Sequence, residues 1–109
     1  MQFINEAPVY KLVRVTGPTH NLLVLRFSPA PLESPILVQA LDAAQPCVNP
    51  MEEAEVLENV KRGIEESTGK FGKQYFLEAI QYLAGDSRPA EVYCEMTKEI
   101  IRRIELQSS

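Results

Sequence analysis

The chain has 109 residues, of which 45% are hydrophobic and 24% are charged, and its formal net charge is −4 at pH 7. This length accommodates one domain with one core, and the composition excludes disordered and fibrous proteins. The acidic balance excludes general nucleic-acid binding, which needs an excess of Lys and Arg to neutralise phosphates. We therefore expect a single domain over residues 1–109.

Two segments near the amino terminus have the composition of strands. Residues 9–16 (VYKLVRVT) and 21–28 (NLLVLRFS) are rich in β-branched and aliphatic side chains, and a Gly-Pro pair lies between them. In the second segment Leu23, Leu25 and Phe27 alternate with other residues, so we expect them to face the core. The two segments predict an antiparallel hairpin.

A proline-rich passage, PAPLESP (29–35), follows the hairpin and predicts an extended connector, because proline removes backbone donors. The next residues, ILVQALDAAQ (36–45), predict a short helix. A short strand over ILV is the alternative, since brief apolar runs do not separate the two by periodicity.

Residues 49–69 (NPMEEAEVLENVKRGIEESTG) predict the most clearly marked helix of the chain. Asn49 is the expected N-cap, Pro50 takes the first helical position, and Glu52 completes a capping box. Gly69 is expected to close the helix in a left-handed conformation. Between Glu52 and Glu66 there are six glutamates and two cations, a net charge of −4 that equals the charge of the whole chain.

Residues 71–84 (FGKQYFLEAIQYLA) fit two interpretations. The polar and apolar residues recur at helical spacing, whereas the aromatic content and the need of the hairpin for a partner favour a third strand over 74–83. Both interpretations stay open at this point.

A second well-marked helix is predicted near the carboxyl end, capped by Asp86 or Ser87 with Pro89 in its first turn. Glu99 and Arg103 form an i,i+4 pair, and the tail LQSS (106–109) is expected to fray. The apolar stripe comprises Val92, Tyr93, Met96, Ile100 and Ile104. The elements together predict an α+β fold, with a small antiparallel or mixed sheet packed by two to three helices.

The sequence contains no recognisable catalytic or metal-binding motif, so the prediction is a non-enzyme without cofactor or metal. His20 is the only histidine and lies in the predicted hairpin loop, where a small enzyme could use it only with partners that the spacing does not nominate. Cys47 and Cys94 have no metal spacing. Without a signal peptide or a span of about 20 apolar residues, we expect a cytoplasmic protein with reduced thiols and no membrane association.

The acidic helix is the candidate contact surface for a protein partner with a basic surface, because carboxylates on a helix face can steer such a partner. A solvated face without function is the alternative interpretation. Tyr75 and Tyr82 could add aromatic anchors. The candidate partner-binding residues are Glu52, Glu55, Glu58, Glu65 and Glu66.

The last third of the chain, IQYLAGDSRP (80–89) followed by VY (92–93) and EIIRRI (99–104), resembles the end of small bacterial immunity proteins. These proteins accompany polymorphic or contact-dependent growth inhibition toxins. The resemblance implies that 74–83 is a strand in a small mixed sheet, and that the protein is a non-enzymatic inhibitor that neutralises a cognate toxin by direct binding. It transfers no site residue. An accessory or oligomerising subunit with a solvated acidic helix, and a small enzyme using His20, are the alternatives.

Overall fold

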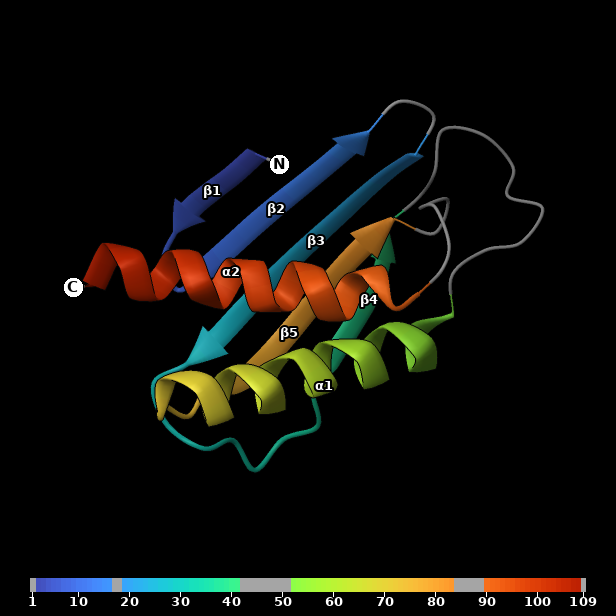
Figure 1. Cartoon of the computed structure of the whole chain (residues 1–109). Coiled ribbons are helices and arrows are strands. Elements are labelled where there is room, and N and C mark those ends of the chain that lie inside the picture. The colour runs from blue at the N-terminus through green and yellow to red at the C-terminus, as the bar shows by residue number, and fades with distance from the viewer. Residues whose placement is uncertain (1, 17–18, 42–51, 84–89, 109) are drawn as a thin grey trace.

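The computed structural model describes residues 2–16, 19–41, 52–83 and 90–108. It contains five strands and two helices within these ranges (Figure 1), so the predicted α+β class is confirmed. The strands are β1 (Gln2–Glu6), β2 (Val9–Thr16), β3 (Thr19–Ser28), β4 (Leu37–Leu41) and β5 (Phe76–Leu83), and the helices are α1 (Glu53–Phe71) and α2 (Val92–Ser108).

The sheet is mixed and has the strand order β1-β2-β3-β5-β4. The predicted hairpin is formed by β2 and β3, with Leu12 opposite Leu23 in the antiparallel register. Of the two interpretations of residues 71–84, the strand is correct, because β5 pairs with β3 and supplies the neighbour that the hairpin needs. β5 also pairs with β4, and this is the only parallel pair among the described strands.

The structure contains two strands, β4 and β1, that differ from our expectations. The segment 36–45 was expected to be a helix, but Leu37–Leu41 is strand β4, in register with β5 from Ala79 to Leu83. A free edge on β5 stabilises the extended form of this short apolar run, which local periodicity could not indicate. Strand β1 was not predicted, because most of its residues are polar or exposed and it is held mainly by pairing with β2.

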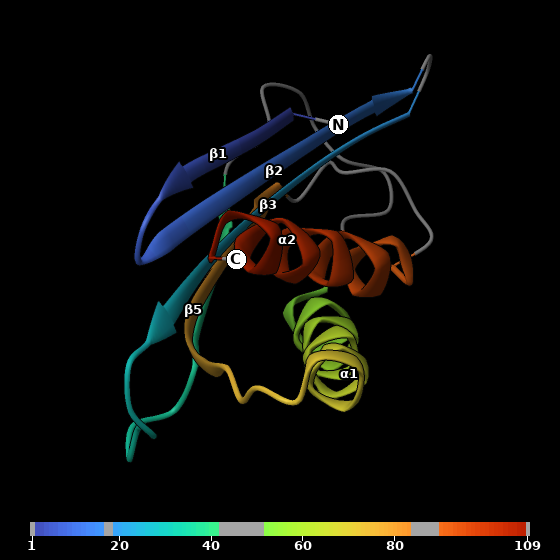
Figure 2. The ribbon, with the colours of Figure 1, turned by 60° about the vertical axis from the view of Figure 1, so that its left-hand side comes forward.

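The connection from β4 through α1 to β5 has an unusual hand. In Figure 1, with the helices in front of the sheet and both parallel strands pointing upward, β5 lies to the left of β4. This arrangement is a left-handed crossover, whereas about 98% of such connections in proteins are right-handed. Its consequence is that α1 and α2 lie on the same face of the sheet (Figure 2).

The core lies between this face of the sheet and the two helices. Along β3 the residues Leu23 and Leu25 are fully buried and Phe27 is 8% exposed, as their alternation predicted. Tyr82 of β5 meets Tyr93 of α2 edge to face, with ring centroids 6.1 Å apart. The other main core residues are Leu12, Val56, Val60, Leu77, Ile80, Met96, Ile100 and Ile101.

The ends of α1 differ from those predicted. The helix begins at Glu53 with Glu52 as its N-cap, and the Glu55 side chain accepts a hydrogen bond from the Glu52 backbone N–H at 3.3 Å. The expected cap Asn49 lies outside the described residues. The helix continues past Gly69, and Gly72 closes it with φ of 72°, a left-handed conformation that favours glycine.

The carboxyl end of α2 also differs from the prediction. The helix extends to Ser108, so the expected fraying of 106–109 was wrong for residues 106–108. Two contacts with β1 hold the carboxyl-terminal part of α2: Asn5 donates a hydrogen bond to Gln107, and the Arg103 guanidinium lies over the Phe3 ring. The predicted caps of α2 lie outside the described residues.

Candidate functional site

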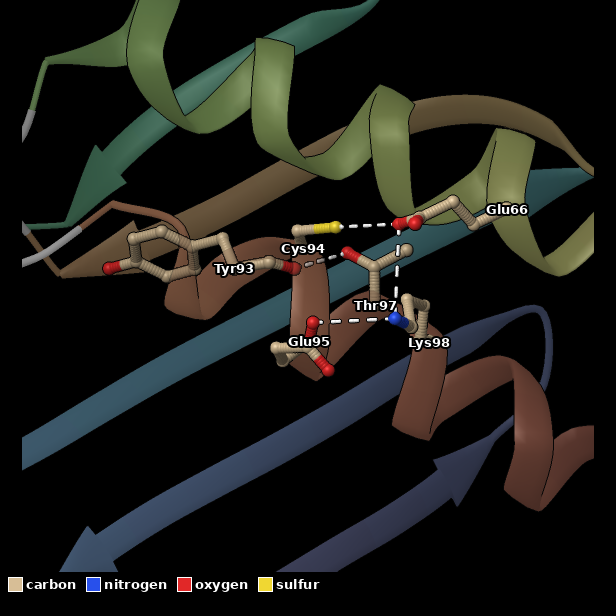
Figure 3. A network of polar contacts seen from close by, with 6 residues as sticks. All are labelled: Glu66, Tyr93, Cys94, Glu95, Thr97 and Lys98. Carbon is tan, nitrogen blue, oxygen red and sulfur yellow. Dashed lines mark hydrogen bonds and ion pairs between the residues drawn. The ribbon is translucent and has the colours of Figure 1, made fainter.

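The five predicted partner-binding glutamates lie in separate environments along α1. Glu52 and Glu55 form the amino-terminal cap, where negative charge suits the helix dipole. Glu58 and Glu65 are exposed on the solvent side, and Glu58 is 3.8 Å from Arg62, its i,i+4 neighbour. Glu66 is directed toward α2 (Figure 3). The structure therefore brings Glu58 and Glu65 to one outer surface and separates them from the other three.

Glu66 belongs to a polar network between the two helices (Figure 3). Its carboxylate accepts a hydrogen bond from Cys94 Sγ at 3.2 Å and lies 3.8 Å from Lys98 Nζ. Lys98 also reaches Glu95 at 3.3 Å. One glutamate thus joins α1 to a thiol and an ammonium group on α2, and it serves the contact between the helices.

The chemistry of this network is that of a structural contact. Cys94 is a free thiol and is 5% exposed, and burial followed by the hydrogen bond to Glu66 raises its pKa to about 11. A thiol with a raised pKa is a poor nucleophile at neutral pH, because the thiolate is the reactive form. Thr97 donates its hydroxyl hydrogen to the carbonyl of Tyr93 at 2.7 Å.

A groove of about 690 Å³ lies beside the outer side of α1. It is lined by three segments: the connector before β4, the middle of α1, and the start of β5. Its apolar lining includes Leu32, Ile36, Leu57, Ile64 and Phe76. Leu32 is 40% exposed, and this connector is the part of the wall that comes from the predicted proline-rich passage.

Charged groups border this groove on the α1 side. Lys61 and Glu65, four residues apart, both line it, and both are exposed. Glu65 is the only one of the five predicted glutamates in the lining. The groove therefore combines an apolar surface with a cation and a carboxylate at the rim, a pattern typical of surfaces that bind proteins or other ligands.

The two tyrosines suggested as anchors have internal roles. Tyr82 is 1% exposed and belongs to the core. Tyr75 donates its hydroxyl hydrogen to Glu105 of α2, whose carboxylate also lies 3.1 Å from Lys73. Burial and this hydrogen bond raise the pKa of Tyr75. Tyr75 still lines one end of the groove.

The histidine considered in the sequence does not contribute to the groove. His20 was expected in the hairpin loop, but it is exposed on β3, where it pairs with Val15 of β2 because β3 begins at Thr19, closer to the turn than predicted. Cys47 lies outside the described residues. Within the described residues no cluster of three or more His, Cys, Asp or Glu side chains has the arrangement of a metal site. Neither described helix is long and apolar enough to cross a membrane.

Sequence reasoning did not identify the apolar lining of the groove. The proline-rich passage was assigned only as a connector, although proline and leucine held against a helix produce an exposed apolar surface. Comparisons with protein-family models, with curated proteins and with solved structures give no match to this chain.

Proposed function

We propose that this protein is a non-enzymatic, protein-binding inhibitor of the immunity or antitoxin kind, which neutralises a partner that has a basic surface. The single observation that supports this proposal is the apolar groove beside the solvent side of α1, with Glu65 at its rim. The net charge of −4 and the resemblance of the last third to immunity proteins point in the same direction.

The groove and the carboxylates have different tasks in this proposal. An apolar side chain of the partner enters between Leu32 and Ile64, and burial of one such side chain contributes about 1.5–3 kcal/mol. Glu58 and Glu65 lie in water, so they contribute mainly to the rate of association and to selection of a basic partner. Affinity therefore depends on the groove, and the effect of salt depends on the glutamates.

The experiment begins with a photo-reactive amino acid in place of Leu32, and separately in place of Leu106, which is 61% exposed at the end of α2. The protein crosslinked from Leu32 but not from Leu106 is then purified as the candidate partner. Its activity is titrated with the wild-type chain. An inhibitor abolishes that activity at one equivalent, whereas an accessory subunit leaves it unchanged or raises it.

Two matched pairs of variants, tested for binding to the isolated partner, locate the contact surface on this chain. We expect Leu32→Glu to weaken binding at least tenfold and Leu106→Glu to leave it unchanged. Glu65→Lys should lower the association rate and its dependence on salt, whereas Glu91→Lys, with the same change in net charge at an exposed position directly before α2, should not. Full inhibition by Leu32→Glu at unchanged affinity would exclude the groove as the contact surface.

A further inference from the structure

The two edges of the sheet differ in how well they are protected from pairing with another strand. Edge strand β1 (QFINE) carries Glu6, and its Asn5 side chain is occupied by Gln107 and by the backbone N–H of Ala7. Edge strand β4 (LVQAL) has no charge and no proline, the two features by which proteins commonly block an edge. Leu37 at its start is 65% exposed.

The sequence of β4 is symmetric in chemical type about Gln39. Leu37 and Leu41 flank it at a distance of two residues, and Val38 and Ala40 at a distance of one. Antiparallel pairing of two identical strands around a twofold axis places each residue opposite its symmetric counterpart. Leucine would then lie opposite leucine, valine opposite alanine, and glutamine opposite glutamine, without a charge at any position.

The two faces of the sheet agree with this register. Val38 and Ala40 pair with Ile80 and Tyr82 and pack on the core. Leu37, Gln39 and Leu41 lie on the opposite face, which neither α1 nor α2 covers, because neighbouring residues of a strand alternate between faces. Pairing would cover the exposed Leu37 of each chain with Leu41 of the other, so apolar area is removed from water on the open face.

The side-chain amide of Gln39 can form hydrogen bonds with its own copy across the twofold axis. Its Oε1 accepts a hydrogen bond from Gln81 Nε2 at 3.1 Å, so its own NH₂ group is directed away from that contact. At the twofold axis each Gln39 could donate to the Oε1 of its copy, since a carbonyl oxygen has two lone pairs. A row of four amides, from Gln81 of one chain to Gln81 of the other, would result.

We propose that β4 is the interface with a second copy of this chain, which joins two five-stranded sheets into one continuous sheet through antiparallel β4–β4 pairing centred on Gln39. Five paired residues extend over only about 16 Å, which is small for an interface between stable partners. The dimer is therefore weak and depends on concentration. Strand β1 is unsuited to the same pairing, because Phe3 would lie opposite Asn5.

The test is sedimentation of the full chain over a concentration series up to about 1 mM. We expect wild type to shift from monomer toward dimer. Gln39→Lys and Gln39→Glu should each raise the dissociation constant at least tenfold, because like charges would meet at the axis. Gln2→Lys, the matched substitution on exposed β1, should associate as wild type does.

Mixing the two Gln39 variants separates this register from a folding defect. Opposite charges at the axis should restore association to at least the wild-type level, and a misfolded variant would not recover. A wild-type chain that stays monomeric at 1 mM, or that dimerises equally well with Gln39→Lys, overturns the proposal.

Salt distinguishes this interface from the groove. Two chains of charge −4 repel each other, so self-association should strengthen as salt rises, whereas capture of a basic partner should weaken. A chain that stays monomeric would therefore not contradict the inhibitor proposal. A chain that binds no basic partner would not contradict the dimer.

Discussion

The two faces of the sheet differ sharply, and β3 shows the difference within one strand. Leu23 and Leu25 point toward the helices and are fully buried, whereas Leu22 and Val24 point to the open face and stay partly exposed. All four are aliphatic, so composition alone does not separate them. Burial is therefore decided by the position of both helices on one face of the sheet, and the apolar residues of the other face are covered by neither α1 nor α2.

The same contrast holds within α1, where Gly63 and Gly69 lie in opposite environments. A Cβ atom on Gly63 would be 2.7 Å from the carbonyl oxygen of Cys94 and 2.8 Å from Thr97 Cβ, whereas a Cβ atom on Gly69 would have no neighbour within 4 Å. Gly63 therefore permits the close approach of α1 to α2.

Substitution of leucines on the two sides of β3 should show the largest effect. We expect Leu25→Ala to lower the free energy of unfolding by about 2–5 kcal/mol, because it leaves a cavity in the core. Leu22→Ala removes the same atoms from the open face and should cost about 1 kcal/mol. Urea denaturation measures both, and equal losses would contradict the one-sided core.

Alanine substitutions of Gly63 and Gly69 should change the stability of the protein in opposite directions. Gly63→Ala forces backbone and buried atoms to move and should destabilise the protein by about 1–3 kcal/mol. Gly69→Ala should stabilise it by about 0.5–1 kcal/mol, since alanine is the better helix former at an open position. Thermal unfolding followed by circular dichroism compares the two, and a stabilising Gly63→Ala would show that the helices are not closely packed there.

The smallest effect is expected at Glu99 of α2, whose side chain is 21% exposed. Hydrogen bonds from Arg102 and Arg103, at 2.9 and 2.8 Å, hold its pKa at about 2. The pKa is thus lower in the folded state than in the unfolded state, so the stabilisation is present above pH 4.5 and is lost as the pH falls toward 2.

Glu99→Gln should therefore cost only about 0.5 kcal/mol at pH 7, since its arginine partners are partly solvated. The difference between the variant and wild type should shrink as the pH falls below 4. Urea denaturation at pH 7 and pH 3 provides the comparison. A loss that is independent of pH would assign the effect to packing.

Much of the fold could be predicted from local pattern. The hairpin followed from its turn residues and its alternating leucines, and the stripe of α2 followed from helical spacing, although Ile101, which is fully buried, was missed. What could not be predicted depends on neighbours distant in the chain. Strand β4 is a strand because β5 offers an edge, and strand β1 because β2 does.

The candidate site was only partly predictable, because an acidic run does not define one surface. Successive residues of a helix turn by about 100°, so Glu58 and Glu65 share a face while Glu66 points elsewhere. The sequence could indicate this separation, but not that Cys94 and Lys98 would meet Glu66. The groove also joins three segments that are far apart in the chain, and no local pattern indicates such a meeting.

The contacts between β1 and the last turns of α2 have a consequence for the order in which the chain folds. Asn5 meets Gln107 and Phe3 meets Arg103, so these contacts close a loop of about a hundred residues. Contacts of such long range form late and slow the search for the native state. During synthesis β1 can pair with β2 early, but its contacts with α2 can form only after residues 103–107 have left the ribosome.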